Sequence, residues 1–228
     1  SNPSERPTMS LNGELFDDDT HAAHELLLPG AVLLRRFALA EQDSLISAVS
    51  QVLALAPLRQ MITPGGFRMS VATTSCGQLG WISDRRGYRY SSVDPLTDQP
   101  WPVLPHSFFT LAQSAAMHAG YTDFVPDACL INRYGVGDRM SLHQDRNEKD
   151  FSQPIVSVSL GLPVTFQLGG LERSDKALKV RLEHGDVLVW GGPSRLRFHG
   201  VLPLKAGAHT SLGEQRINLT FRRAGGTA

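Results

Sequence analysis

The residues best suited to chemistry in this 228-residue chain are two histidines and one aspartate. His143 and Asp145 stand two positions apart, and alternate side chains of an extended segment point to the same face, so both can bind one ion. His199 adds a second imidazole at the end of another expected strand. Two histidines and one carboxylate occupy one face of an octahedral metal and leave three positions open. This ligand set is typical of non-haem Fe(II) that also binds a cosubstrate and dioxygen.

The other histidines offer no matching carboxylate at this spacing, and we expect them to be structural or exposed. His184 is the one rival to His199 as third ligand, because it precedes Gly185 and Asp186 before a strand. It is expected in a turn, whereas His199 lies beyond the next hairpin. The alternative is that the His-x-Asp spacing arises by chance and binds no metal, since an isolated histidine is more often a structural group than a ligand.

A second set of residues predicts a site for a small dianion. Alternate residues of the strand expected at 215–222 share one face, which carries Arg216, Asn218, Thr220 and Arg222. A buried guanidinium needs an anionic partner. Two such groups fit a dicarboxylate, with about 1.5 to 3 kcal/mol for each charge-assisted contact. Asn132 and Tyr134, on one face of the strand expected at 128–134, are predicted to hydrogen bond the same ligand.

The alternative for these arginines is a polar end of a barrel, in which they pair with internal Asp or Glu. The strand itself has no acidic residue between Gln215 and Arg223, which favours an external ligand. Arginine suits this role because its planar guanidinium binds a carboxylate or phosphate through two hydrogen bonds at once.

The elements that position these residues are mostly short strands. Gly, Pro and Asp turns separate β-type runs at 128–134, 155–160, 164–168, 178–182, 186–190, 196–199 and 215–222. Upstream, the patterns predict a strand at 31–37 and helices at 40–56 and 106–119. We expect a mainly β (α+β) fold. It is a double-stranded β-helix, or jelly roll, at 128–223, with N-terminal supporting helices and an extended loop region at 59–90.

Length and composition indicate a single domain at 29–228, preceded by a flexible acidic tail at 1–28. The tail carries a net charge of −5 in a chain of net charge zero, so the remainder carries +5 and a polyanionic partner is not excluded. No apolar run approaches the ~20 residues needed to cross a bilayer, and we expect a cytoplasmic monomer without membrane contact. Cys76 and Cys129 form no Cys-x-x-Cys pair, so we expect reduced, buried thiols.

Several motifs together resemble the bacterial AlkB family of oxidative demethylases. They are DACLINRY at 127–134, the His143/Asp145 pair, PIVSVSLGLP at 154–163, EHGDVLVWGG at 183–192, His199 and RINLTFR at 216–222. The likeness extends from about Ala31 to Arg223. Residues 60–66 and the Gly80-Trp81 step also resemble the nucleotide-recognition lid of this family, which we place at 59–90.

The resemblance implies Fe(II) bound by His143, Asp145 and His199. It implies 2-oxoglutarate bound to the metal and held by Asn132, Tyr134, Arg216, Asn218 and Arg222. Dioxygen would oxidise the N-alkyl group of a nucleobase while 2-oxoglutarate is decarboxylated to succinate, releasing formaldehyde and the repaired base. The implied function is repair of DNA alkylation damage, with single- or double-stranded DNA as partner and RNA as a further candidate. Lesions such as 1-methyladenine and 3-methylcytosine are favoured because they have lost Watson–Crick pairing and flip out at lower cost.

For the substrate, the resemblance implies that an extruded base stacks between Trp81 and His143, with Tyr88 also in the lid. Such stacking contributes roughly 1 to 3 kcal/mol per base. Further candidates for contact with base, backbone or phosphate are Tyr90, Arg173 and Arg89. The alternative for Trp81 is a core position, since tryptophans beside glycine also fill apolar gaps.

Asn147 departs from the family pattern, because the members carry an acid two residues past the metal-binding aspartate. A neutral amide cannot favour a cationic methylated base through charge, so base preference is expected to change. Glu148 beside it is a candidate to compensate.

Two other functions share many of these residues. An oxygenase of the same fold acting on a small metabolite or a protein would keep every metal and oxoacid residue and differ in the lid. A non-catalytic cupin-like binding module would keep the fold without turnover. The three metal ligands together with both arginines argue against the second.

Overall fold

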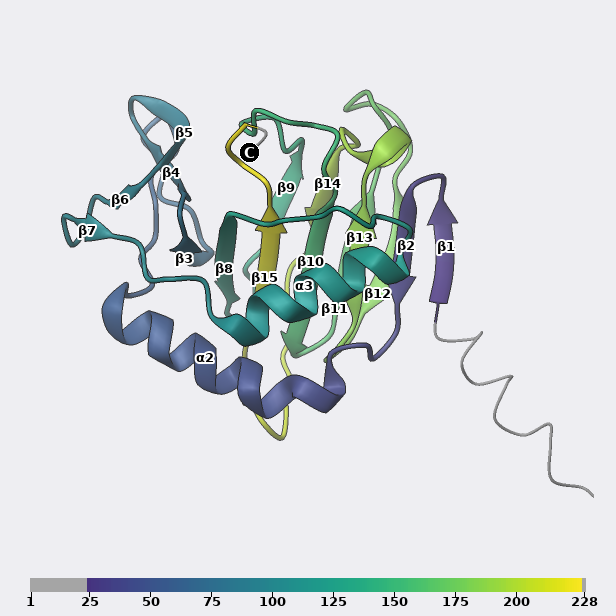
Figure 1. Cartoon of the computed structure of the whole chain (residues 1–228), viewed down its shortest axis with the longest axis horizontal. Helices are drawn as coiled ribbons and strands as arrows, with labels where there is room; N and C mark the ends of the chain where they lie inside the picture. Colours follow the sequence, from purple (N-terminus) through teal and green to yellow (C-terminus); the bar gives the residue numbers. More distant parts are fainter. Residues whose placement is uncertain (1–23, 227–228) are drawn as a thin grey trace, which may run out of the picture.

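A computed structural model describes residues 24–226. Its major sheet contains seven antiparallel strands in the order β1-β2-β13-β10-β15-β8-β3 (Figure 1). In that order the strands are His24–Leu28, Ala31–Leu34, Val187–Trp190, Ile155–Gly161, Arg216–Arg222, Ala128–Tyr134 and Ala72–Gly77. Neighbours in the sheet are mostly distant in sequence, so the pairing depends on tertiary folding.

A minor sheet of four strands packs against one face of the major sheet. Its order is β12 (Leu178–Leu182), β11 (Val164–Leu168), β14 (His199–Val201) and β9 (Met140–His143). Apolar side chains from both sheets fill the space between them, including Phe166 and Trp190, whose ring centroids lie 5.7 Å apart. Two facing antiparallel sheets of this kind confirm the predicted mainly β, jelly-roll fold.

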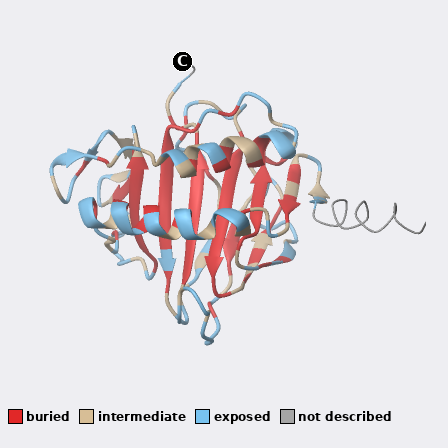
Figure 2. Cartoon of the chain, turned by 60° about the horizontal axis from the view of Figure 1, so that its bottom comes forward, coloured by how far each residue is buried: buried red, intermediate tan, exposed pale blue. Residues whose placement is uncertain are grey.

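Two helices cover the other face of the major sheet, as Figures 1 and 2 show. They are α2 (Gln42–Leu55), preceded by the 3-10 helix η1 (Leu39–Glu41), and α3 (His106–His118). Leu45 of α2 and Phe108 of α3 are fully buried against Leu219 and Phe221 of β15. The helices predicted from apolar spacing are therefore confirmed, with bounds that differ by one or two residues.

The region expected as an extended loop at 59–90 contains three strands. β3 lies at the edge of the major sheet, where it pairs with β8. β4 (Gly80–Asp84) and β5 (Gly87–Ser91) form a separate hairpin beside that edge, followed by β6 (Val93–Asp94) and β7 (Gln99–Pro100) (Figure 1). Met61, Ile82 and Trp101 form a small apolar cluster under the hairpin. The bounds of a lid at 59–90 stay a prediction, and we call β4–β5 the hairpin below.

The prediction of a flexible tail at 1–28 is wrong for residues 24–28, which form β1 and pair with β2. Leu27 and Leu28 pack against the core between the two sheets, a long-range contact that a short apolar run does not reveal. Residues 1–23 of the predicted tail lie outside the described residues.

Two other strand boundaries also differ from the prediction. The strand expected at 31–37 ends at Leu34, because Arg36 adopts a positive φ of 56°. The strand expected at 196–199 begins only at His199, because the chain is still turning after the 3-10 helix η2 (Gly192–Ser194), where the Arg197 N–H donates to the Ser194 carbonyl.

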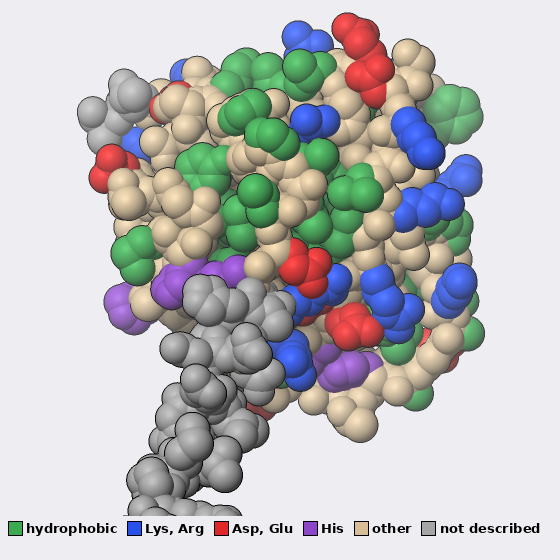
Figure 3. Space-filling model, turned by 90° about the vertical axis from the view of Figure 1, so that its right-hand side faces the viewer, with side chains coloured by type: hydrophobic (Ala, Val, Ile, Leu, Met, Phe, Trp, Pro, Cys, Tyr) green, Lys and Arg blue, Asp and Glu red, His purple; other side chains and the backbone are tan. Residues whose placement is uncertain are grey.

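The two α-helices of residues 24–226 are 14 and 13 residues long, and neither is long and apolar enough to cross a bilayer. Figure 3 views the side of the molecule that carries β1. Acidic and basic side chains both appear on this side.

Candidate active site

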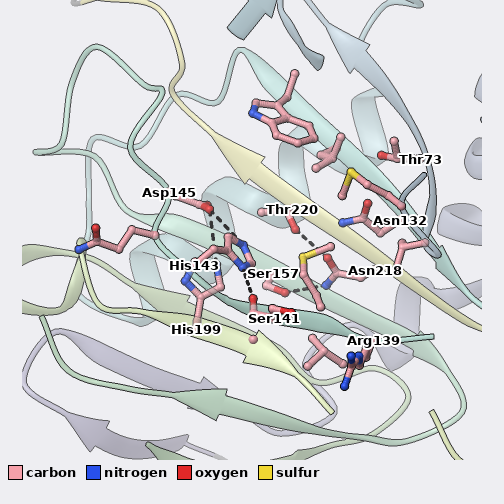
Figure 4. A pocket seen from close by; sticks show the side chains of 18 of the residues that line it. Thr73, Asn132, Arg139, Ser141, His143, Asp145, Ser157, His199, Asn218 and Thr220 are labelled. Carbon is pink, nitrogen blue, oxygen red and sulfur yellow. Dashed lines mark hydrogen bonds and ion pairs between the residues drawn. The ribbon is translucent and has the colours of Figure 1, made fainter. Parts of the chain in front are cut away.

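His143, Asp145 and His199 come together as the sequence predicts. One ligand atom from each lies within 4.8 Å of the others, and this is the one such group of three found in residues 24–226. Asp145 Oδ1 is 3.4 Å from His199 Nε2 and 3.8 Å from His143 Nε2 (Figure 4). The two histidines are register partners on β9 and β14, and Asp145 follows two residues after β9. The three side chains could therefore hold one metal ion.

Backbone carbonyl groups orient both imidazole rings. His143 Nδ1 lies 2.7 Å from the Ser141 carbonyl oxygen, and His199 Nδ1 lies 3.2 Å from that of Arg197. A carbonyl only accepts, so each Nδ1 must carry the hydrogen. The lone pair of each Nε2 is then directed toward Asp145, as metal ligation requires.

The protonation states of the cluster also suit a cation. Burial lowers the pKa of His143 to about 4, although the side chain lines the cavity and is 36% exposed. Burial by itself would raise the pKa of Asp145, but the charge of Arg222 outweighs it and holds this pKa well below its ordinary value. A neutral imidazole and an ionised carboxylate are the forms that bind metal.

A cavity of about 700 Å³ contains this cluster and extends between the sheets toward the hairpin. The residues predicted for metal and cosubstrate that line it are His143, Asp145, His199, Asn132, Tyr134, Arg216, Asn218 and Arg222. The residues predicted for substrate that line it are Trp81, Tyr88, His143, Asn147 and Arg173. The topology thus brings residues from six strands and two loops to one space.

The alternation predicted for β15 is confirmed, since its apolar residues lie in the core under the helices while its polar residues line the cavity. The Asn218 amide donates to Ser157 Oγ at 2.7 Å, and Thr220 Oγ1 donates to Asn218 Oδ1 at 2.7 Å (Figure 4). These hydrogen bonds fix the amide at the floor of the cavity.

Arg216 is the clearest sign of a missing anion. Its side chain is 1% exposed and lies over the Tyr134 ring, with 5.0 Å from the guanidinium carbon to the ring centroid. Nη2 donates to Ser159 Oγ at 3.0 Å, but Nε and Nη1 have no hydrogen-bond partner among the described residues. Buried charged donors without partners are costly, so the cavity fits an anionic ligand at this place.

Arg222 behaves differently from the prediction that both arginines await an external anion. Its Nε donates to Asp145 Oδ2 at 2.7 Å. Pairing with an internal acid, the alternative considered for these arginines, is therefore what the structure shows for Arg222. The acid comes from a segment 77 positions away in the chain, so the composition of β15 could not reveal it.

The hairpin contributes two aromatic rings to the cavity. Trp81 and Tyr88 are stacked, with ring centroids 5.5 Å apart and planes at 15°. Trp81 also packs against the small apolar cluster, so this half-buried residue is in contact with the core as well as with the cavity. Arg173 lies over Phe198 at 5.0 Å and donates to the Leu142 carbonyl.

Two residues predicted for substrate contact do not line the cavity. Arg89 makes two hydrogen bonds of 2.9 Å to Asp84, and this contact is the main cause that lowers the pKa of Asp84 to about 2. The Tyr90 hydroxyl donates to Glu148 Oε2 at 2.8 Å. Glu148 also pairs with Arg195, so its carboxylate is occupied within the protein rather than free to replace the acid missing at position 147.

Sequence reasoning missed three functional residues. Ser157 and Ser159 anchor Asn218 and Arg216, and they could have been found as the polar alternation inside the apolar run PIVSVSLGLP. Arg195, which is 2% exposed, bonds the loop that carries Asp145. No sequence pattern distinguishes it from other arginines.

His184 does not compete with His199 as a ligand. Its Nδ1 accepts from the Gly161 N–H at 2.9 Å and its Nε2 lies 2.8 Å from Gln42 Oε1. Both ring nitrogens are thus used in joining β10 to α2, and the expectation of a structural role for this histidine is confirmed.

Comparison with known proteins agrees with this arrangement. Residues 30–222 match the family model of the 2OG-Fe(II) oxygenase superfamily. The chain is 57% identical to the alpha-ketoglutarate-dependent dioxygenase AlkB of Salmonella typhimurium, over 92% of this chain and 97% of the relative. The solved structure of OsALKBH1 has a TM-score of 0.73 and 30% identity, covering 88% of this chain and 99% of that one. The human nucleic acid dioxygenase ALKBH1 is 32% identical over 54% of this chain and 32% of its own length.

Fold, cavity and donor set define a 2OG-Fe(II) oxygenase, an enzyme that uses Fe(II), 2-oxoglutarate and dioxygen. Within that superfamily the chain belongs to the AlkB family of alpha-ketoglutarate-dependent dioxygenases. The predicted family, enzyme class and cofactors are confirmed.

Proposed function

We propose that this enzyme oxidatively removes alkyl groups from nucleobases of DNA and so repairs alkylation damage. The names of its AlkB and nucleic acid dioxygenase relatives support this function. The observation that carries it is a single cavity in which a two-histidine, one-aspartate cluster, a buried arginine with two donors that have no partner among the described residues, and a hairpin tryptophan meet. The same proposal includes single- or double-stranded DNA as partner, RNA as a further substrate, and a cytoplasmic monomer.

In this proposal His143, Asp145 and His199 bind Fe(II). The side chains proposed to hold 2-oxoglutarate are Asn132, Tyr134, Arg216, Asn218 and Arg222. Arg216 is best placed to bind a carboxylate, because two of its donors await an acceptor. Arg222 forms an ion pair with Asp145 and so stabilises the negative charge of this carboxylate.

When bound, iron and 2-oxoglutarate supply the oxidation of a carbon–hydrogen bond by dioxygen, coupled to decarboxylation of the oxoacid to succinate. The chain contributes binding and orientation. The carbonyl groups behind His143 and His199 hold their ring nitrogens toward the cluster. The apolar walls formed by Phe166 and Trp190 restrict water beside His199.

For the substrate we propose that an extruded base stacks between Trp81 and His143, with Tyr88 supporting the indole from behind. Asn147 and Arg173 line the same cavity and are proposed to contact the base or its backbone. Arg89 is held by Asp84, and the Tyr90 hydroxyl is bonded to Glu148 and Arg222, so we propose indirect roles for both.

The test is direct demethylation. Purified protein with Fe(II), 2-oxoglutarate and ascorbate is incubated with an oligonucleotide that contains 3-methylcytosine or 1-methyladenine, and methyl loss is followed by mass spectrometry. We expect repair by the native protein and none by His143→Ala. Undiminished repair by that variant would remove the metal assignment.

An oxygenase that acts on a small metabolite or a protein is the second candidate, because it would share the metal and oxoacid residues. Trp81→Ala separates the two functions. For a nucleobase substrate we expect loss of repair while slow succinate formation without DNA persists. Full repair by Trp81→Ala would exclude stacking on the indole.

A further inference from the structure

Arg195 bonds the segment that carries Asp145 at three places. Its Nη1 donates to the Asp145 carbonyl at 2.9 Å, its Nη2 to Glu148 Oε1 at 2.6 Å, and its Nε to the Gln153 carbonyl at 2.9 Å. Arg195 is 2% exposed and Glu148 6%, so these contacts are buried. One rigid guanidinium thus spans the segment at 145–153, and a lysine with a single nitrogen cannot reproduce that geometry.

The same contacts extend to the hairpin. Tyr90 on β5 donates to Glu148 Oε2 at 2.8 Å and accepts from Arg222 Nη1 at 3.3 Å. Arg222 in turn donates to the Asp145 carboxylate at 2.7 Å. The bonds therefore close a ring that runs from Asp145 through Arg222, Tyr90, Glu148 and Arg195 back to Asp145. Burial raises the pKa of Tyr90, so its hydroxyl keeps the hydrogen that it donates.

We propose that Arg195 is a positioning residue that holds Asp145 in place for metal binding and, through Glu148 and Tyr90, ties the hairpin to the metal centre. This inference rests on the proposed metal site. Arg195 holds the backbone of Asp145 while Arg222 holds its carboxylate, so the ligand is oriented at both ends. Partners behind metal ligands commonly affect metal affinity about 10- to 100-fold.

Arg59 provides a matched control away from the cavity. Its Nη1 and Nη2 donate to Asp94 Oδ1 and Oδ2 at 2.6 and 2.8 Å, and its Nε donates to the Pro57 carbonyl at 2.7 Å. Asp94 is fully buried, and neither Arg59 nor Asp94 lines the cavity. Replacement of Arg59 by lysine therefore disrupts a comparable buried ion pair without touching the ring around Asp145.

The experiment measures Mn(II) binding by calorimetry on the full chain, without cosubstrate or turnover. We expect Arg195→Lys to weaken Mn(II) binding about tenfold or more and Arg59→Lys to change it less than about threefold. Thermal melts establish that both variants are folded. If Arg195→Lys does not fold, Glu148→Gln, which keeps the shape and removes the ion pair, is expected to weaken Mn(II) binding in the same direction.

Tyr90→Phe tests the link to the hairpin. It removes one hydroxyl and leaves Arg195 in contact with Asp145, so we expect near-native Mn(II) affinity but faster amide hydrogen exchange across residues 80–91. Native Mn(II) affinity in Arg195→Lys or in Glu148→Gln, or an equal loss in Arg59→Lys, overturns the positioning role. Unchanged Mn(II) binding by His143→Ala would instead overturn the proposed metal site, so the two failures are distinguishable.

Discussion

The indole Nε1–H of Trp81 donates to Asn147 Oδ1 at 3.2 Å. This hydrogen bond joins the hairpin to the loop two residues beyond Asp145. The ring is also stacked on Tyr88, so its orientation is set from two sides. The residue at position 147 therefore affects the proposed base site in two ways, through whether its side chain is neutral or charged and through the position of the tryptophan.

Asn147→Asp is expected to change the ratio of 1-methyladenine to 3-methylcytosine turnover. An aspartate can accept the same hydrogen bond from Trp81 and adds a negative charge beside a cationic base. Because the position is exposed, we expect the ratio to change by up to about fivefold, corresponding to about 1 kcal/mol. Competition between the two lesions in one reaction measures the ratio, with Asn147→Ala as the control that removes the hydrogen bond without adding charge. Equal ratios for native protein and Asn147→Asp would discard the idea.

Arg216→Met is expected to raise the KM for 2-oxoglutarate about 10- to 150-fold, because one charge-assisted contact of roughly 1.5 to 3 kcal/mol is lost. Succinate formation at varied 2-oxoglutarate measures it. Arg133 of β8 is exposed and does not line the cavity, so Arg133→Met serves as the matched control with native KM. A KM for Arg216→Met within twofold of the native value would contradict the assigned role.

Mn(II) with 2-oxoglutarate is expected to stabilise the protein against heat. At 100 times the dissociation constant a ligand that binds only the folded state adds about 2.7 kcal/mol, which for a chain of this size raises Tm by about 5 to 11 °C. Thermal scans in the presence of a chelator, and scans of His143→Ala, should show no such rise. A rise of the same size in His143→Ala would place the metal elsewhere.

Gly161→Ala is expected to destabilise the fold by roughly 1 to 3 kcal/mol, because Gly161 has a φ of 91° at the end of β10. An added Cβ would also overlap the carbonyl oxygen of Gln215. Gly137 has a φ of 86° with no atom within 4 Å of such a Cβ among the described residues. Gly137→Ala therefore isolates the backbone strain, and denaturant unfolding of the two variants should show the larger loss for Gly161→Ala. Equal losses would mean that the overlap relaxes at no cost.

Much of the candidate site follows from local pattern. The alternation in RINLTFR predicts which side of β15 faces the cavity, because successive side chains of any strand point to opposite faces. His143 ends β9 and Asp145 follows two residues later, so their short spacing keeps them near each other, and their residue types limit the metals they suit. Helices at 40–56 and 106–119 follow from apolar spacing with turn residues at their ends.

Other features have no local signal. The strand at 24–28 forms because it pairs with β2 and because its leucines pack against the core between the two sheets. Strands within 59–90 depend likewise on β8 and on the cluster around Trp101. The sequence pattern of a segment shows whether that segment favours a strand or a helix. Which strand it pairs with depends on the sheet edge that the tertiary structure brings beside it.

The sequence by itself determined the class of chemistry, through two imidazoles, a carboxylate and an inward arginine at spacings that strands convert into common faces. Only the tertiary structure decided which buried charged groups pair with one another. It paired Arg222 with Asp145, left two donors of Arg216 without a partner among residues 24–226, and placed Arg195 behind the Asp145 loop. The physical reason is that periodicity is a property of neighbouring residues, while the partner of a buried charge is whatever the fold brings within about 3 Å of it.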